Sequence, residues 1–300
     1  MEAGRSGLPA RGPMTWEKRA AVSACNDTQG PPRDARDGDF ARLSGGAGRV
    51  IGARIEHHKK AVSTMDIARD AGLAGAPEGL VVTADEQTVG RGRHARQWVS
   101  RPGEDLLLSV VLRPRPALAP ELLMLAALAA VRTVRVMTDV TPAIKWPNDV
   151  RVTSRKLCGV LAESVTMSDG SVLAVAGIGL NVNMAPDEAE LIGATSLRAL
   201  RGGCVSRSEA LLELLRAMDD MYAALRRGET LLPEWRDRLE TLGQHVNVAV
   251  GNPLHPDRII SGVAEDVDAQ GRLLVRDADG RVWPVASGEV TLSRAAGGAP

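Results

Sequence analysis

A run of arginines and glycines that follows an apolar segment is the first candidate for chemistry in this chain. Residues 84–100 read ADEQTVGRGRHARQWVS and come directly after the apolar residues 80–83. Gly90 and Gly92 allow positive φ and a close approach of the backbone to a ligand. The arginines around them form forked, charge-assisted bonds to carboxylate or phosphate, and Trp98 is expected to pack in the ordered loop. The pattern predicts an anion-binding loop; the loop alone leaves open a solvated surface or a nonspecific nucleic-acid contact.

Three later segments place polar groups where a plain core strand would be apolar. Residues 143–150 read AIKWPNDV, in which a proline ends a short apolar entry and an amide and a carboxylate follow on a turn. Residues 155–164 read RKLCGVLAES, a strand-like run opened by a lysine. Residues 177–183 read GIGLNVN, a glycine-punctuated strand that ends in two asparagines. The four segments are therefore interpreted together.

In this order and spacing, with Ser63-Thr64-Met65-Asp66 ahead of them, the segments closely resemble the biotin–protein ligases (biotin–[acetyl-CoA-carboxylase] ligases). The resemblance covers about residues 50–292, and four ordered motifs are more specific than any one of them. It implies an α/β (α+β) mixed-sheet catalytic domain of the biotin/lipoate ligase type, followed by a small SH3-like β-barrel domain. It also implies ATP-dependent biotinylation of a specific lysine on a biotin carboxyl carrier domain, through a biotinyl-5'-adenylate intermediate.

Composition and charge agree with such an enzyme. The 300 residues and the 44% hydrophobic content suit one large domain, or a large one and a small one. The core must be mostly aliphatic, because one Phe and one Tyr accompany five Trp. The 37 basic and 37 acidic residues cancel, which argues against broad electrostatic binding to nucleic acid or to an anionic membrane. Any anion site must therefore be local.

Cysteine usage and apolar runs bear on the compartment. Cys25, Cys158 and Cys204 are widely spaced and odd in number, so neither a disulfide framework nor a zinc set is indicated. The longest apolar stretch, residues 122–131, is too short to span a bilayer, and the N-terminus lacks the apolar core of a signal peptide. A reducing cytoplasm fits these features best.

The chain divides into three parts. Residues 1–48 are rich in Gly, Pro, Arg, Asp and Ala without periodicity, which predicts a disordered extension; a true start at Met14 or a later codon is the alternative. Residues 49–244 form the expected catalytic domain and residues 245–295 the expected C-terminal domain. Some family members carry an N-terminal helix-turn-helix that makes them repressors, and no such pair of helices is readable here. The resemblance is therefore to the monofunctional type, without the DNA-binding domain.

Hydrophobic periodicity and turn residues predict the elements that position these motifs. Two capping boxes predict helix starts, at Ser63 with Asp66 and at Ser206 with Glu209. Helices are expected at 63–71, 120–137, 210–227 and 233–242, the last closed by Gly243. Strands are expected at 80–83, 106–112, 143–146, 157–165 and 172–180. Short strands follow at 246–250, 258–267, 272–277 and 281–286, with a tight hairpin at Asp279-Gly280, which predicts a small barrel-like domain.

The resemblance assigns the chemistry to a lysine, a carboxylate and an arginine. In the first step a carboxylate attacks the α-phosphate of ATP, so positive charge must offset the repulsion of two anions. Lys156 is the expected catalytic point charge, supported by Arg93; a strand-end lysine that snorkels to solvent is the plain alternative. Asp149 is expected to bind the Mg²⁺ that enters with ATP and to take a proton from the acceptor lysine. An ordinary turn at Asn148-Asp149 is its alternative.

Biotin requires polar groups for its ureido ring inside an apolar box, because unpaired buried groups cost about 1–3 kcal/mol each. By resemblance, the expected biotin-binding residues are Ser63, Thr64, Met65, Gln87, Arg91, Gly92, Arg93 and Lys156. The expected ATP-binding residues are Arg91, Arg93, Arg96, Asn148, Asp149 and Asn181. The plain alternatives are a helix cap for Ser63 and a strand-end turn for Asn181. The resemblance implies no tightly bound prosthetic group, a biotin carboxyl carrier protein as partner, no DNA or membrane, and a monomer or homodimer.

Some positions depart from the family pattern or have a plain interpretation. Ala95 stands where members usually have Gly, which makes the loop stiffer on that side. Met65 stands where many members have Asn, so the motif does not assign the third biotin contact. Cys158 is expected to pack in the core. His57 and His58 are expected in a solvated charged run, and they are not expected to bind a metal, because their spacing fits no metal-ligand pattern.

Two other classes of function compete with this reading. A lipoate/octanoate–protein ligase would share the fold and the adenylate chemistry, but the GRGR loop with KWPND and KLCG favours biotin. A non-enzymatic biotin-responsive regulator would need a DNA-reading module, and none is visible in the sequence.

Overall fold

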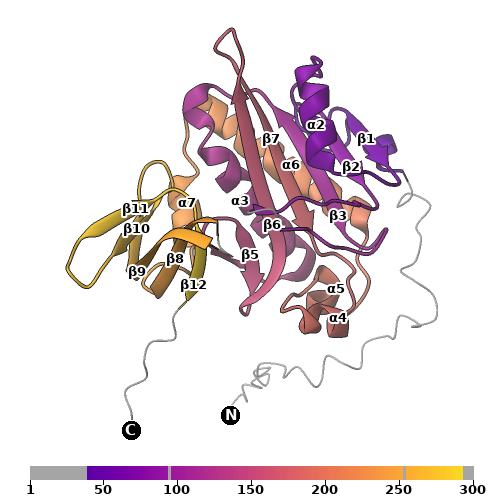
Figure 1. Ribbon diagram of the computed structural model, residues 1–300. Coiled ribbons are helices and arrows are strands. Elements are labelled where there is room, and N and C mark those ends of the chain that lie inside the picture. The colour runs from indigo at the N-terminus through magenta and orange to yellow at the C-terminus, as the bar shows by residue number, and fades with distance from the viewer. Residues whose placement is uncertain (1–38, 94–95, 253–254, 293–300) are drawn as a thin grey trace, which may run out of the picture.

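The computed structural model describes residues 39–93, 96–252 and 255–292, which form a seven-stranded sheet and a five-stranded sheet (Figure 1). Helices pack on the seven-stranded sheet, and the five-stranded sheet stands beside it. The predictions for residues 1–38 and for Ala95 lie outside the described residues. Among the residues that are described, no helix combines the length and the apolar composition needed to cross a membrane.

The seven-stranded sheet is mixed, in the order β1-β2-β3-β7-β6-β5-β4. Its strands are β1 (Ile55–His58), β2 (Val81–Ala84), β3 (Leu106–Leu112), β4 (Ala143–Lys145), β5 (Asp149–Val152), β6 (Arg155–Thr166) and β7 (Val172–Leu180). β1 and β2 are parallel, and the other neighbouring pairs are antiparallel. β3 reads LLLSVVL and is buried along its whole length, as expected for a strand covered on both faces.

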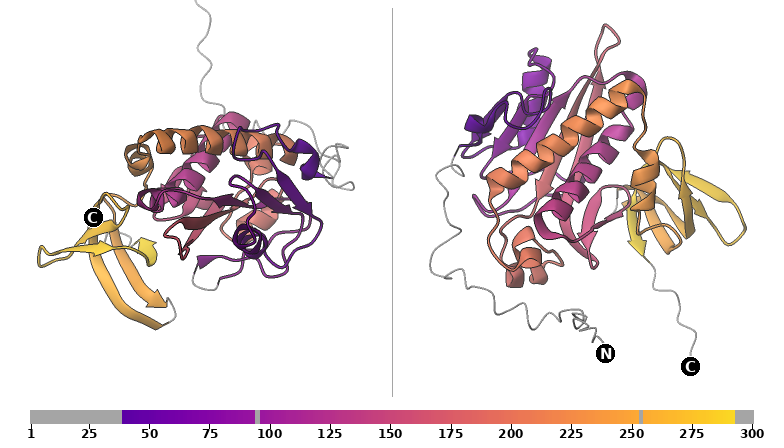
Figure 2. Two further views of the ribbon diagram at one scale, coloured as in Figure 1. Left: turned by 90° about the horizontal axis from the view of Figure 1, so that it is seen from above. Right: turned by 180° about the vertical axis from the view of Figure 1, so that it is seen from behind.

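Helices cover both faces of this sheet. They are η1 (Phe40–Leu43), α2 (Thr64–Leu73), η3 (Pro116–Leu118), α3 (Glu121–Thr138), α4 (Pro186–Leu191), α5 (Leu197–Arg201), α6 (Arg207–Arg227) and α7 (Leu232–Asp237). α3 and α6 lie side by side over one face, and α2 packs on β3 and β7 from the other (Figures 1 and 2). The result is a three-layer arrangement with the sheet in the middle.

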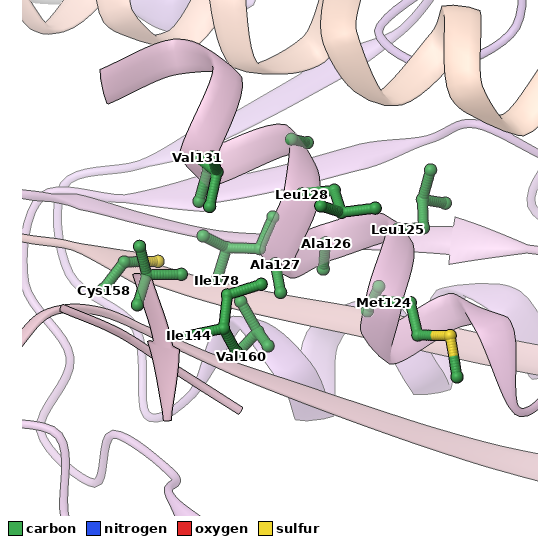
Figure 3. Close-up of a cluster of buried hydrophobic side chains, with 14 of the residues drawn as sticks. Met124, Leu125, Ala126, Ala127, Leu128, Val131, Ile144, Cys158, Val160 and Ile178 are labelled. Atoms are coloured by element: carbon green, nitrogen blue, oxygen red, sulfur yellow. The ribbon is translucent and has the colours of Figure 1, made fainter. Parts of the chain in front are cut away.

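The sequence of α3 explains how closely it packs on the sheet. Four of its alanines have no exposed surface, at positions 126, 127, 129 and 130, and such small side chains let the helix approach the strands. Larger side chains of the helix, among them Leu128 and Val131, complete a cluster with Ile144, Ile178 and Cys158 of the sheet (Figure 3). The expectation that Cys158 packs in the core is confirmed, and burial raises the pKa of its thiol.

The C-terminal sheet is antiparallel throughout, in the order β11-β10-β9-β8-β12. Its strands are β8 (His245–Asn252), β9 (His255–Val267), β10 (Leu273–Arg276), β11 (Val282–Val285) and β12 (Glu289–Leu292). The expected small β domain is confirmed. Trp146 ties it to the first sheet: its backbone N donates to Thr241 Oγ1 (2.9 Å) and its Nε1 donates to the Gly271 carbonyl (3.0 Å).

Of three helix predictions, the structure confirms one and contradicts two. The cap at Ser206 is confirmed, because its Oγ accepts from the Glu209 N–H (3.3 Å). Ser63 occupies the N-cap position of α2, but its side chain makes no capping hydrogen bond, so the predicted capping box is wrong. The predicted helix 233–242 is wrong at its end: α7 stops at Asp237, because the next residues pair with the edge strand β4 through backbone bonds around Ile144.

The sequence analysis missed three strands, β1, β5 and β12, and four short helices, η1, η3, α4 and α5. The interpretation of His57 and His58 as a solvated run is wrong, because they lie on β1 and the His57 side chain is only 5% exposed. The His57 ring contacts Thr83 Oγ1 (2.9 Å), Asp85 Oδ2 (3.4 Å) and the Phe40 ring. η1 lies inside the segment that the composition assigns to the extension, and Phe40 is buried there in the main core cluster.

Candidate active site

A pocket opens on the face of the seven-stranded sheet that carries α2, the face turned to the viewer in Figure 1. It lies over the middle strands β3, β7 and β6, between the start of α2 and the arginine loop, which we define as the described residues 85–93 and 96–98. The lining residues are Thr64, Met65, Gln87, Arg91, Gly92, Arg93, Arg96, Gln97, Trp98, Leu108, Ser109, Asn148, Asp149, Lys156, Gly159, Val160, Leu161, Gly177, Ile178, Gly179 and Glu289.

One end of the pocket holds a cluster of neutral polar groups. Gln87 Oε1 accepts from the Thr64 backbone N (2.7 Å) and from Thr64 Oγ1 (3.1 Å). Thr64 Oγ1 and Ser109 Oγ share a hydrogen bond of 2.9 Å. Backbone bonds between residue 61 and residues 86 and 88 fix the start of the arginine loop beside α2. Hydroxyl and amide groups that are fixed in this way can present both donors and acceptors to a ligand.

Ser63 lies next to this cluster without lining the pocket. The residue is 1% exposed, and its Oγ has no hydrogen-bond partner among the described residues. A buried hydroxyl left unpaired costs about 1–3 kcal/mol, which a bound polar group would recover. The position therefore supports a role in ligand binding better than a role as a helix cap.

The floor of the pocket is made of glycines. An added Cβ at Gly159 or Gly179 would come within 2.8 or 2.5 Å of the Trp98 indole, and one at Gly177 within 2.5 Å of Met65 Sδ. These three positions therefore require glycine, because no larger side chain leaves room for its neighbour. The sheet surface is left flat and open to the arginine loop.

The arginine loop is a short antiparallel turn that crosses the pocket. Gly92 N donates to the Arg96 carbonyl (2.8 Å) and Trp98 N to the Gly90 carbonyl (3.0 Å). Arg91 forms a forked pair with Glu163 on β6, with distances of 2.6 and 3.2 Å, and a third bond to a carboxylate on α2. Two carboxylates thus balance its charge, so Arg91 acts in this state as the attachment of the loop to the sheet.

Charged groups gather at the other end of the pocket. Lys156 Nζ lies 2.7 Å from Asp149 Oδ1, and Arg93 Nη1 donates to Asn148 Oδ1 (3.3 Å). Burial lowers the pKa of Arg93, and nearby carboxylates, Glu289 among them, oppose that shift. A guanidinium stays protonated in proteins all the same. This end therefore presents fixed positive charge beside the carboxylate of Asp149.

Strand ends place these groups. Asp149 opens β5 and pairs in register with Gly159, and a register shift follows it between residues 150 and 151. Lys156 stands at the start of β6, and its backbone is bonded to the segment after α4 through residues 193 and 195. The Asn148 side chain donates to the Val160 carbonyl (3.0 Å). The predicted turn, strand entry and lysine thus converge because β4, β5 and β6 are consecutive neighbours.

Asn181 is in a different position from the other predicted ligand residues. It follows β7, the residue is 3% exposed, and its Nδ2 donates to the carbonyls of Thr195 (2.9 Å) and Lys156 (3.3 Å). It does not line the pocket, and in this state its amide holds the chain segment that carries the lysine. This contact agrees with the plain alternative for Asn181, that of a turn residue at the end of a strand.

The structure brings together most of the predicted site residues in one pocket. The predicted residues that line it are Thr64, Met65, Gln87, Arg91, Gly92, Arg93, Arg96, Asn148, Asp149 and Lys156, while Ser63 and Asn181 are not among the lining residues. The sequence analysis missed Ser109, Glu163 and Glu289. A signal existed for Ser109, a hydroxyl in the middle of an otherwise apolar strand; Glu163 and Glu289 give no such signal, because carboxylates on strands are usually solvated.

Comparisons with known proteins agree with this arrangement. Residues 59–183 match the Biotin/lipoate A/B protein ligase family, and residues 241–293 match the Biotin protein ligase C terminal domain. The fold is similar to that of a biotin protein ligase from Aquifex aeolicus in complex with biotin and ATP, with a TM-score of 0.66 and 27% identity. That match covers 80% of this chain and 99% of the other.

Two curated relatives differ in how much of their length is matched. The chain is 35% identical over 239 residues to a biotin–[acetyl-CoA-carboxylase] ligase of Mycobacterium tuberculosis, covering 77% of this chain and 86% of the relative. It is 36% identical over 179 residues to the bifunctional ligase/repressor BirA of Bacillus subtilis, covering 58% of this chain and 55% of the relative. The chain thus matches about half the length of this bifunctional protein. Through the two family matches and the long Mycobacterium match, the chain belongs to the biotin protein ligases.

Proposed function

We propose that this protein uses ATP to attach biotin to a specific lysine of a biotin carboxyl carrier domain, through biotinyl-5'-adenylate. The observation that carries the proposal is the division of one pocket into two chemically different ends. Thr64, Gln87 and Ser109 form a neutral polar cluster suited to a ureido ring, and Arg93 and Lys156 supply positive charge suited to phosphate. An enzyme that joins biotin to ATP needs both ends within one ligand length.

In the first step, a carboxylate oxygen of biotin attacks the α-phosphorus of ATP, and pyrophosphate leaves with the electrons of the broken P–O bond. Both reactants are anions, so their approach requires fixed positive charge. Lys156 and Arg93 are assigned that role, with Arg91 and Arg96 as further phosphate ligands and Asn148 as the group that orients Arg93. The contact between Lys156 Nζ and Asp149 supports this role, because it holds the ammonium in the pocket before the substrates bind.

In the second step, the ε-amine of the acceptor lysine attacks the acyl carbon of the adenylate, an amide forms, and AMP leaves. The amine must lose a proton, and Asp149 is the proposed base. The 2.7 Å contact between its Oδ1 and the Lys156 ammonium supports this assignment, because it places a carboxylate beside the charge proposed to bind the adenylate.

The Mg²⁺ that accompanies ATP is proposed to bind at Asp149. Mg²⁺ commonly takes one or two carboxylates together with phosphate oxygens and water, and Asp149 and Glu289 are the carboxylates among the described lining residues. The donor set therefore fits a metal that arrives with the nucleotide. Among the described residues, no group of three or more His, Cys, Asp and Glu side chains is placed to hold a resident metal.

The proposal extends to the partners and organisation of the protein. The acceptor is a biotin carboxyl carrier protein of an acetyl-CoA or related carboxylase, and the enzyme works in the cytoplasm as a monomer or homodimer without binding DNA. Residues 49–244 supply catalysis and residues 245–295 complete the site. Equal numbers of basic and acidic residues support the absence of a nucleic-acid partner.

The deciding experiment is mass spectrometry of a purified biotin carboxyl carrier domain after incubation with the protein, ATP, Mg²⁺ and either biotin or lipoate. We expect the mass to increase by one biotinyl group with biotin, and to stay unchanged with lipoate or without ATP. A lipoyl adduct, or no adduct with biotin, would contradict the proposal.

A further inference from the structure

We infer that Trp98 is a positioning residue for Lys156. Its indole ring helps to hold the Lys156 ammonium in position, and the ring is itself in position only when the arginine loop is ordered. The inference rests on the proposed role of Lys156 in adenylate formation. It concerns a side chain that the sequence predicts only to pack within the loop.

The Trp98 ring packs against two glycines of the seven-stranded sheet. Gly159 on β6 and Gly179 on β7 are register partners, and an added Cβ at either would meet the Trp98 ring at 2.8 or 2.5 Å. The two glycines therefore form a bed that the flat ring occupies. Trp98 Nε1 is buried and has no hydrogen-bond partner among the described residues, so packing on the bed, not a polar bond, holds the ring there.

The lysine lies across the same bed. Its Nζ is 5.4 Å from the centroid of the Trp98 ring and 2.7 Å from Asp149 Oδ1. The end of its stem passes over Gly159, where an added Cβ would meet Cε at 3.2 Å and Nζ at 3.3 Å. The ammonium is thus held between a carboxylate and an aromatic face, and a cation within about 6 Å of a Trp centroid is attracted by the ring.

The indole is also part of the arginine loop. Trp98 N donates to the Gly90 carbonyl (3.0 Å), and Arg91 and Gln97 form the neighbouring bridge of the same turn. The ring therefore moves with the backbone that carries Arg91 and Arg93. In this structure the ring lies on the two glycines with the ammonium beside it; if the loop lifts, the ammonium loses one of its two neighbours.

The test compares two substitutions at Trp98 with a control. Trp98→Phe keeps an aromatic face, and Trp98→Leu keeps apolar volume without one; Trp283→Leu removes an indole that lies between Arg258 and Arg281 on the other sheet, outside the pocket. In single-turnover adenylate formation at saturating biotin and ATP, we expect Trp98→Leu to lower the rate about tenfold or more and Trp98→Phe to stay within about threefold. The control should match the unsubstituted protein.

Two further measurements separate positioning from a general structural role. The biotin dissociation constant of Trp98→Leu, measured by calorimetry, should stay within about threefold, so that the loss falls on the rate. In the Lys156→Gln background, which lacks the ammonium, adding Trp98→Leu should lower the rate of adenylate formation by less than about twofold. Gly179→Ala, which displaces the ring while keeping Trp98, should lower the same rate and serves if Trp98→Leu does not fold.

Three results would overturn the inference and leave the proposed function standing. They are an unchanged rate in folded Trp98→Leu, an effect of Trp98→Leu on biotin binding alone, and a loss of rate in the Lys156→Gln background as large as in the unsubstituted protein. Unsubstituted protein that forms no biotinyl-adenylate would overturn the proposed function, and this inference with it.

Discussion

Arg96 of the arginine loop and Glu289 of β12 form an ion pair, with Nη1 and Oε1 3.0 Å apart. The two residues are 193 positions apart in the chain, and they join the loop over the first sheet to the edge of the second. Glu289 also opposes the lowering of the pKa values of Arg93 and Lys145, both of which burial depresses. One carboxylate of the C-terminal sheet is therefore part of a site otherwise built on the first sheet.

Glu289→Gln should loosen the loop without destabilising the fold. Arg96 is 62% exposed, and an exposed pair contributes about 1 kcal/mol or less to stability. We expect hydrogen exchange at residues 90–98 of the ligand-free protein to become up to about fivefold faster. Asp266→Asn is the matched control, because it removes another C-terminal ion pair, with Arg236, away from the pocket. Equal exchange in Glu289→Gln and the control would show that the pair does not hold the loop.

Lys156→Ala should abolish most adenylate formation while the fold survives. The ammonium is the proposed charge between two anionic reactants, so its loss should raise the barrier by about 3–5 kcal/mol. The measurement is biotin-dependent pyrophosphate exchange, together with thermal unfolding. Lys59→Ala, which removes an exposed lysine, is the control, and near-normal exchange in Lys156→Ala would end the assignment.

Ligands should order the arginine loop further. A loop with few apolar anchors gains order from ligand contacts, so we expect hydrogen-exchange or proteolytic protection at residues 87–98 to increase when biotin and ATP are present. Gly92→Val should release the adenylate faster, because an added Cβ would lie 3.1 Å from the Arg96 carbonyl. Gly203→Val, where an added Cβ meets nothing within 4 Å, is the control. Equal protection with and without ligands would indicate a preformed loop.

Asp105 should make stability fall as the pH rises. The residue is 1% exposed and its carboxylate accepts from the Val182 N–H (2.8 Å), and burial raises its pKa to about 7 from 3.8. Between these values the native state holds a proton that the unfolded chain has lost, so the free energy of unfolding decreases with pH, by at most about 1.4 kcal/mol per unit, and levels off above the native pKa.

The check on Asp105 is urea unfolding between about pH 5 and about pH 8. Asp105→Asn keeps an acceptor for Val182 and cannot ionise, so its stability should vary less over this range. Asp220→Asn, at an exposed position on α6, should keep the dependence of the unsubstituted protein. Glu104, whose pKa burial also raises, contributes in the same direction and sets a residual slope. Parallel curves for all three proteins would rule out Asp105 as the source.

The sequence predicts best where one local signal decides the outcome. The apolar strand at residues 106–112 and the capped helix that begins after Ser206 are found where they were expected, because burial and a side-chain cap act through neighbouring residues. The motif residues Asn148, Asp149 and Lys156 converge for a related reason: short connections keep β4, β5 and β6 adjacent.

The remaining features depend on partners that are distant in sequence. His57 looks like part of a solvated run, but its ring is buried by Phe40 and by the end of β2. Glu163 and Glu289 become site residues only because the arginine loop folds back onto them. The α7 helix ends early because β4 offers an edge to the residues that follow it. No local pattern encodes these pairings.

Because Glu289 lies on the last described strand, it is synthesised after the loop residue with which it pairs. A ribosome releases β12 after every other described element, so the arginine loop acquires its anchor on the second sheet only when synthesis has passed residue 289. All seven strands of the first sheet precede that point in the chain, but the carboxylate of Glu289 that lines the pocket does not. A chain that ends before residue 289 would therefore lack the ion pair that joins the arginine loop to the second sheet.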